Sequence, residues 1–130
     1  MSSGLQVREL HAGYGQSRVL QGLAFDLPPG QILAVLGRNG SGRSTLARAL
    51  MGLLAARGSA RWQGQDLLGV PTHAIARLGV AYVPESRDVF PRLTVAHNLA
   101  LGQQPRAARP AYWTPEWVFE RFPALAARRD

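Results

Sequence analysis

A glycine-rich segment at residues 37–45 constrains the fold of this chain more than any other feature. It lies between an unbroken apolar run at 32–36 and a stretch with helical spacing that begins near Ser44. Glycines permit the positive φ angles at which successive backbone N–H groups converge on one point, and a following helix directs the positive end of its dipole there. The segment therefore predicts an anion-binding turn between a strand and a helix.

The spacing fits the phosphate-loop pattern G-x-x-x-x-G-K-[ST] except at one position, where Arg43 replaces the lysine. In that pattern the next hydroxyl binds Mg²⁺, so Ser44 is the predicted metal ligand and Thr45 a second hydroxyl near the α-phosphate. Arg43 keeps the charge, but its guanidinium is larger and planar. We expect weaker nucleotide binding and a greater loss of hydrolysis. The predicted phosphate contacts are Gly37, Asn39, Gly40, Ser41, Gly42, Arg43, Ser44 and Thr45.

Three other interpretations of this segment are weaker. A ligand-free turn does not explain the glycine spacing, the adjacent hydroxyls and the flanking elements together. The dinucleotide pattern G-x-G-x-x-G, started at Gly40, has Thr45 at its third glycine position. Residues 66–69 imitate a GTPase switch element, but the guanine-reading motif requires lysine, and the chain contains none.

Apolar periodicity predicts strands and helices that alternate around the loop. Half-buried strands are expected at 5–10 and 18–27, with Tyr14 on the loop between them and Gly22 at a bulge. Continuous apolar runs at 32–36 and 80–83 indicate strands buried on both faces, as in a parallel sheet. A short strand is expected at 59–62, followed by a turn at 63–66. The order of strand, helix and strand predicts a βαβ arrangement.

Capping residues mark the predicted helices. Thr72, Thr94 and Thr114 are the expected N-caps of helices that follow them. Gly79 is the expected stop of the first of these helices, and Pro123 of the last. Trp113 is placed to pack onto Val118 at the start of the last helix.

Arginine dominates the charged residues. The 130 residues carry a formal net charge of +7 without any lysine, and there is no cysteine. A basic chain can bind nucleic acid, but these arginines are scattered rather than clustered in a stripe, so we predict no nucleic-acid partner. No apolar run approaches the roughly 18 residues of a membrane span, and the first eight residues lack a signal-peptide pattern. We expect a cytoplasmic protein without disulfides or a membrane span of its own.

Three segments in this order resemble one family. They are the Gly-Tyr-Gly at 13–15, the loop at 37–45, and the stretch Tyr-Val-Pro-Glu-Ser-Arg-Asp-Val-Phe-Pro-Arg-Leu-Thr-Val at 82–95. Together they resemble the ATP-binding subunit of an ABC transporter, and the last stretch is most similar to branched-chain amino-acid importers. The resemblance implies an α/β phosphate-loop NTPase fold: an antiparallel β portion at 1–30, a phosphate-loop core at 31–90, and the start of a helical subdomain at 91–130.

The resemblance also implies roles for residues outside the loop. Tyr14 would stack on the adenine of ATP, a contact that needs only an aromatic face. Glu85 stands at the family's Q-loop position, where relatives sense Mg²⁺ and the attacking water; His97 is expected to be a surface residue. The implied cofactors are ATP and Mg²⁺. The implied partners are transmembrane permease subunits and a second ATP-binding subunit, on the inner face of the plasma membrane.

Several family elements are absent from the sequence. No Leu-Ser-Gly-Gly-Gln-like signature, no apolar strand with its Mg²⁺-associated aspartate, no catalytic glutamate and no γ-phosphate histidine follows the loop. The chain therefore resembles the N-terminal half of such a subunit, and we assign no catalytic residue. With its buried strands at an open sheet edge, we expect poor stability. Two alternatives stay open. One is a non-catalytic nucleotide-binding or interaction module that docks on a transporter partner through the aromatic C-terminal end, and the other is a nucleic-acid binder whose affinity falls steeply with salt.

Overall fold

A computed structural model describes residues 4–103 and 114–130. The chain divides into two units, Met1–Tyr82 and Val83–Asp130, and each is described by itself below. The expected division at 1–30, 31–90 and 91–130 stays a prediction.

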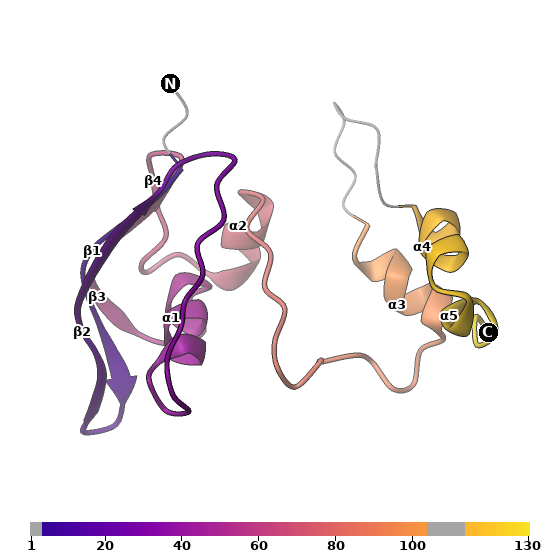
Figure 1. Cartoon of the computed structure of the whole chain (residues 1–130), viewed down its shortest axis with the longest axis horizontal. Helices are drawn as coiled ribbons and strands as arrows, with labels where there is room; N and C mark the ends of the chain where they lie inside the picture. Colours follow the sequence, from indigo (N-terminus) through magenta and orange to yellow (C-terminus); the bar gives the residue numbers. More distant parts are fainter. Residues whose placement is uncertain (1–3, 104–113) are drawn as a thin grey trace. The chain divides into compact units, whose positions relative to one another are not determined.

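The first unit is built on an antiparallel sheet with the strand order β2-β1-β3-β4 (Figure 1). The strands are β1 (Leu5–Tyr14), β2 (Ser17–Leu27), β3 (Ala56–Trp62) and β4 (Gln65–Asp66). β1 lies between β2 and β3. Its pairing with β2 extends from Leu5 opposite Leu27 to Tyr14 opposite Ser17. Its pairing with β3 extends from Leu5 opposite Trp62 to Ala12 opposite Ala56. The predicted antiparallel N-terminal portion and the strand at 59–62 are confirmed.

A bulge in β2 keeps the apolar side chains on one face of the sheet. Leu10 is paired with Leu23 and Ala12 with Leu20, so β2 uses one more residue than β1 between these pairs. Gly22 lies in this interval with φ 74, which confirms the predicted bulge. Leu10, Ala12 and Leu20 are all buried as a result.

Helices α1 (Arg43–Leu50) and α2 (Thr72–Arg77) cover one face of the sheet (Figure 1). Leu46 and Ala49 are the buried apolar residues of α1, whereas Leu53, beyond the end of the helix, is 45% exposed. Pro71 is the N-cap of α2 and no side chain caps this helix, so the prediction of Thr72 as the N-cap was wrong. The core consists of Val7, Leu10, Ala12, Leu20, Leu46, Ala49, Met51, Ala60, Leu67 and Ile75.

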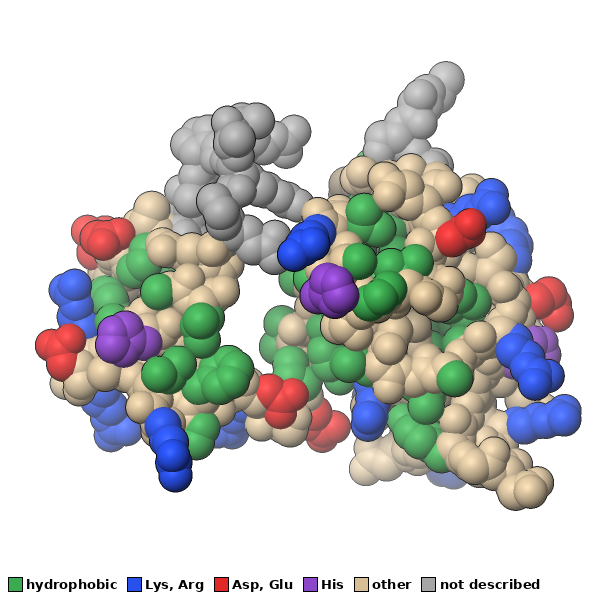
Figure 2. All heavy atoms as spheres, turned by 180° about the vertical axis from the view of Figure 1, so that it is seen from behind, with side chains coloured by type: hydrophobic (Ala, Val, Ile, Leu, Met, Phe, Trp, Pro, Cys, Tyr) green, Lys and Arg blue, Asp and Glu red, His purple; other side chains and the backbone are tan. Residues whose placement is uncertain are grey.

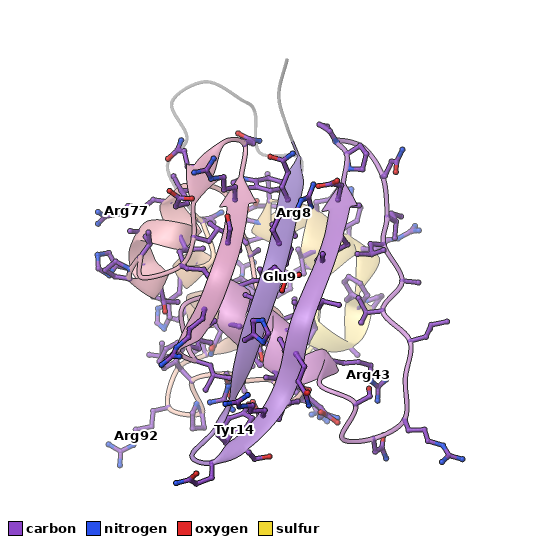
Figure 3. The ribbon with its side chains drawn as sticks, turned by 90° about the vertical axis from the view of Figure 1, so that its left-hand side faces the viewer. Arg8, Glu9, Tyr14, Arg43, Arg77 and Arg92 are labelled. Carbon is purple, nitrogen blue, oxygen red and sulfur yellow. The ribbon has the colours of Figure 1, made fainter. Side chains whose placement is uncertain are left out.

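The outer face of the sheet carries an ion pair between neighbouring strands. Arg8 on β1 donates to the Oδ2 atom of Asp26 on β2 at 2.7 Å (Figure 3, where Arg8 is labelled). The hydrogen bond from Arg8 lowers the pKa of Asp26 below its ordinary value, and the same bond raises the pKa of Arg8. Both side chains are half exposed, so solvent and salt screen the pair.

The predicted strands at 32–36 and 80–83 do not form. Residues 32–36 have no strand structure, and Ile32 and Leu36 are 97% and 87% exposed. Residues 80–83 likewise have no strand structure, and Val83 is 90% exposed. A strand buried on both faces requires hydrogen-bonding neighbours and covering layers, and none of the strands among the described residues pairs with either segment.

Over 83–103 and 114–130, the second unit forms three short helices, α3 (Val95–Leu101), α4 (Pro115–Arg121) and α5 (Pro123–Ala126). Thr94 caps α3 by accepting from the His97 N–H at 3.1 Å, and Thr114 caps α4 by accepting from the Trp117 N–H at 3.2 Å. Both predicted caps are confirmed. α4 ends at Arg121 and Pro123 begins α5. The predicted contact of Trp113 lies outside the described residues.

Apolar side chains reach the surface of both units (Figure 2). In the second unit these include Val89, Phe90 and Phe122, which are 67%, 59% and 50% exposed. Across 4–103 and 114–130, no helix combines the length and the apolar character needed to cross a membrane.

Candidate functional site

The candidate site is the loop that leads into α1. The chain from the end of β2 runs past α1 without strand structure and then turns into the helix (Figure 1). The Ser41 N–H donates to the Arg38 carbonyl at 3.0 Å and closes a turn in which Gly40 has φ 81. An added Cβ at Gly40 would meet nothing within 4 Å. The loop is therefore open to solvent at this turn.

Gly42 sets the start of α1. It is the N-cap, with φ 96 and ψ 8, and no side chain caps the helix. The first intrahelical bond runs from the Leu46 N–H to the Gly42 carbonyl at 2.8 Å, so the N–H groups of the first turn before Leu46 have no partner within the helix. These donors and the helix dipole direct partial positive charge at the loop. The arrangement can hold an anion.

Gly42 also lies against β2. A Cβ at this position would lie 2.9 Å from Leu20 Cδ2 and 3.0 Å from Val19 Cγ1. Both distances are shorter than an ordinary van der Waals contact. The absence of a side chain at Gly42 thus lets the N-terminus of α1 approach the sheet, which fixes where the loop ends.

The side chains of the loop differ in accessibility. Arg43 and Ser44 are exposed, whereas Thr45 is only 5% exposed. The Arg43 Nη2 atom donates to the Asn39 Oδ1 atom at 3.3 Å, so the cation is held by the loop itself. At Gly37, a Cβ would collide with the Ser41 hydroxyl. At the start of α1, Ser44 thus offers an accessible hydroxyl and Arg43 an accessible cation.

Tyr14 lies at the end of a strand rather than on a loop. It is the last residue of β1 and is paired with Ser17, which corrects the expected loop placement. The reason is that 11–14 continue the pairing of β1 with β2 instead of turning after residue 10. Tyr14 is 44% exposed, and the guanidinium carbon of Arg48 lies 5.8 Å from the centroid of its ring. Figure 3 shows Tyr14 and Arg43 toward the end of the sheet that carries the β1–β2 turn.

Arg48 is a residue whose contact the sequence did not reveal. It lies in the last turn of α1, outside the apolar stripe of that helix, and such positions are usually solvated. Its contact with Tyr14 depends on how α1 packs against the sheet. A sequence pattern carries no signal for that.

Glu85 belongs to the second unit. It is exposed in a turn closed by the Arg87 N–H, which donates to the Pro84 carbonyl at 3.2 Å. Arg87 and Asp88 have φ 67 and 42, and the Ser86 hydroxyl donates to Asp88 Oδ1 at 2.6 Å. The role of Glu85 as a metal-associated residue stays a prediction. Within the described ranges, no group of three or more His, Cys, Asp or Glu side chains is arranged to hold a metal ion.

Asn98 holds the segment after this turn in place, and no sequence pattern pointed to it. Its Oδ1 atom accepts from the Phe90 N–H at 2.9 Å, and its Nδ2 atom donates to the Phe90 carbonyl at 3.0 Å. The same Nδ2 atom lies 3.2 Å from the Leu93 carbonyl and 3.0 Å from the Thr94 carbonyl. One α3 side chain thus fixes residues 90–94, which lead from the Glu85 turn into α3.

Comparison with known proteins places these features in a family. The model of a family described as "ABC transporter" matches residues 20–128. The chain is 44% identical over 118 residues to a high-affinity branched-chain amino acid transport ATP-binding protein of Pseudomonas aeruginosa, covering 90% of this chain and 51% of the relative. It is 37% identical over 98 residues to a probable branched-chain amino acid transport ATP-binding protein of Archaeoglobus fulgidus, covering 75% of this chain and 42% of the relative. The chain thus spans about half the length of these curated relatives.

A solved structure supports the same fold. A nucleotide-free ATP-binding cassette from an ABC transporter superimposes with a TM-score of 0.71 at 21% identity, covering 98% of this chain and 56% of the other. Together with the antiparallel N-terminal sheet, this likeness confirms the expected fold class.

Proposed function

Because the chain belongs to the ABC transporter family, we propose that it is the nucleotide-binding part of an importer's ATP-binding subunit. In this proposal residues 37–45 bind MgATP. The observation that carries the proposal is the start of α1, where a glycine N-cap supplies no capping side chain and the first-turn N–H groups remain available to an anion. Importers of branched-chain amino acids are favoured because two relatives carry that description.

The loop residues fit the chemistry of a Mg²⁺-bound triphosphate. The backbone amides around Gly40 and Gly42 hold the phosphate oxygens, and the exposed Ser44 hydroxyl is an oxygen ligand of the kind Mg²⁺ prefers. Arg43 supplies charge toward the terminal phosphates. Tyr14 takes the adenine on its exposed ring. Glu85, exposed in the second unit, stays a proposed metal-associated residue. Bound Mg²⁺ neutralises phosphate charge; the protein's part is to orient the oxygens.

Arg43 weakens this site relative to lysine. Its bond to Asn39 holds a planar, bidentate group where the pattern calls for a compact ammonium. Binding survives because the amides do much of the holding, while the geometry of hydrolysis is stricter.

The assembly follows from the same proposal. The ATP-binding subunit works on the inner face of the plasma membrane with transmembrane permease subunits and a second ATP-binding subunit. A second candidate is a non-catalytic module that docks on a transporter partner, and it is favoured by the exposed Phe90 and Phe122. Co-purification with a transporter partner without ATPase activity would favour the second candidate.

The test is calorimetric titration of the full chain with ATP, with and without Mg²⁺. Wild type is expected to bind MgATP more tightly than ATP in chelator. In Ser44→Ala this Mg²⁺ dependence is expected to disappear, while Ser59→Ala, a serine of β3, serves as the matched control and keeps it. Equal affinities for ATP with and without Mg²⁺ in wild type would remove Ser44 from the metal site. No binding under either condition would remove the function itself.

A further inference from the structure

The contact between Arg48 and Tyr14 joins the two parts of the first unit that the nucleotide proposal uses. Tyr14 ends β1 directly before the β1–β2 turn, and Arg48 lies in the last turn of α1. The guanidinium carbon lies 5.8 Å from the ring centroid, within the range of a cation–π interaction. Both side chains are exposed, so neither is held there by burial in the core.

Helix geometry places Arg48 on the same side of α1 as Ser44. Residues four apart lie one above the other on a helix surface, about 6 Å apart. The proposed phosphate site lies at the start of α1, and Arg48 extends the same helix face toward Tyr14. The helix thus links the phosphate contacts with the aromatic ring.

We propose that Arg48 is a positioning residue for the base of the nucleotide: its guanidinium covers one face of the Tyr14 ring and leaves the opposite face for the adenine. The inference rests on the proposed function, because it assigns Arg48 to the same nucleotide site. A half-exposed tyrosine at a strand end samples several rotamers, and stacking a base on it requires one. The cation–π contact selects that rotamer before the nucleotide arrives, and the pre-ordered ring binds the base more tightly.

A different role for Arg48 is purely structural. A cation in the last turn of a helix interacts favourably with the helix dipole. Arg77 occupies the equivalent place in the last turn of α2 and therefore provides a matched control (labelled in Figure 3). Removing either charge would change helix stability, but only Arg48 would act on the base.

The experiment is a double-mutant cycle on the full chain with two ligands, MgATP and magnesium tripolyphosphate, which lacks the base. Arg48→Met keeps an unbranched stem and removes the charge. We expect it to weaken MgATP binding about two- to fivefold, the effect of one exposed cation–π contact. It should leave tripolyphosphate binding unchanged. In the Tyr14→Ala background, Arg48→Met should cause no further loss of MgATP affinity. Arg48→Lys should keep most of the wild-type affinity. Arg77→Met should bind both ligands like wild type.

Four results would overturn the inference. Unchanged MgATP affinity in Arg48→Met would remove Arg48 from the site and leave the proposed function intact. Equal weakening of MgATP and tripolyphosphate, or an undiminished effect in Tyr14→Ala, would mean that Arg48 acts on the phosphates rather than through the ring. Failure of the wild-type chain to bind either ligand would overturn the proposed function as well.

Discussion

Gly42→Ala tests whether the start of α1 depends on the contact with β2. Gly42 has φ 96, and an L-residue in the left-handed region costs roughly 1–2 kcal/mol. The new methyl would also lie 2.9 Å from Leu20 Cδ2 and 3.0 Å from Val19 Cγ1, and overpacking of this kind costs about 1–3 kcal/mol. We therefore expect the free energy of unfolding to fall by about 2–5 kcal/mol.

Gly40→Ala is the matched control. It has φ 81, so the backbone cost is of the same kind, but an added Cβ would meet nothing within 4 Å. The expected loss is about 1–2 kcal/mol. The difference between the variants, about 1–3 kcal/mol, isolates the contact with Val19 and Leu20. Urea titration followed by far-ultraviolet circular dichroism measures both losses, and at an m-value of about 2 kcal/mol/M a loss of 2 kcal/mol lowers the midpoint by about 1 M. Equal losses in the two variants would refute the packing argument.

Three further predictions address other parts of the molecule. Arg43→Lys should tighten MgATP binding by on the order of tenfold, because an ammonium fits the loop as a compact charge; unchanged affinity in calorimetry would contradict this. Asn98→Ala should lower the free energy of unfolding by about 1–2 kcal/mol through loss of its bonds to Phe90 and its neighbours, while His97→Ala on the same helix should stay within about 0.5 kcal/mol, both measured in urea. The pKa of Asp26 is lowered in the folded state, so its contribution to stability is present above the unfolded pKa of about 3.9 and is lost as pH falls through the lower folded value. The urea midpoints of wild type and Asp26→Asn should therefore converge in acid and in high salt. A difference between them that persists at the lowest pH would contradict the pairing of Asp26 with Arg8.

Local chemistry made several features predictable from sequence. Thr94 and Thr114 act as caps because a hydroxyl needs only the N–H three residues on, and Gly22 marks the bulge because a positive φ favours glycine. The antiparallel strands were visible as alternation. The phosphate loop was recognised by spacing, although its contacts with a nucleotide stay predictions.

Features that depend on packing between distant segments were not predictable. The crowding of Gly42 by Val19 and the contact of Arg48 with Tyr14 both arise from how α1 lies on the sheet. Tyr14 was expected on a loop because its flanking glycines indicate a turn, yet pairing with Ser17 extends β1 to include it. The strand predicted at 32–36 does not form. Its apolar residues are typical of a buried strand, but a strand requires hydrogen-bonding neighbours, and no described strand pairs with this segment.

The most direct test of the central claim is a two-dimensional ¹H–¹⁵N NMR titration of the full chain with MgATP. We predict that the amide signals of residues 40–45 shift first and most and that those of Tyr14 and Arg48 follow. Magnesium tripolyphosphate should reproduce the loop shifts without those at Tyr14. Saturable shifts confined to other residues, with 40–45 unchanged, would show that the loop is not the nucleotide site.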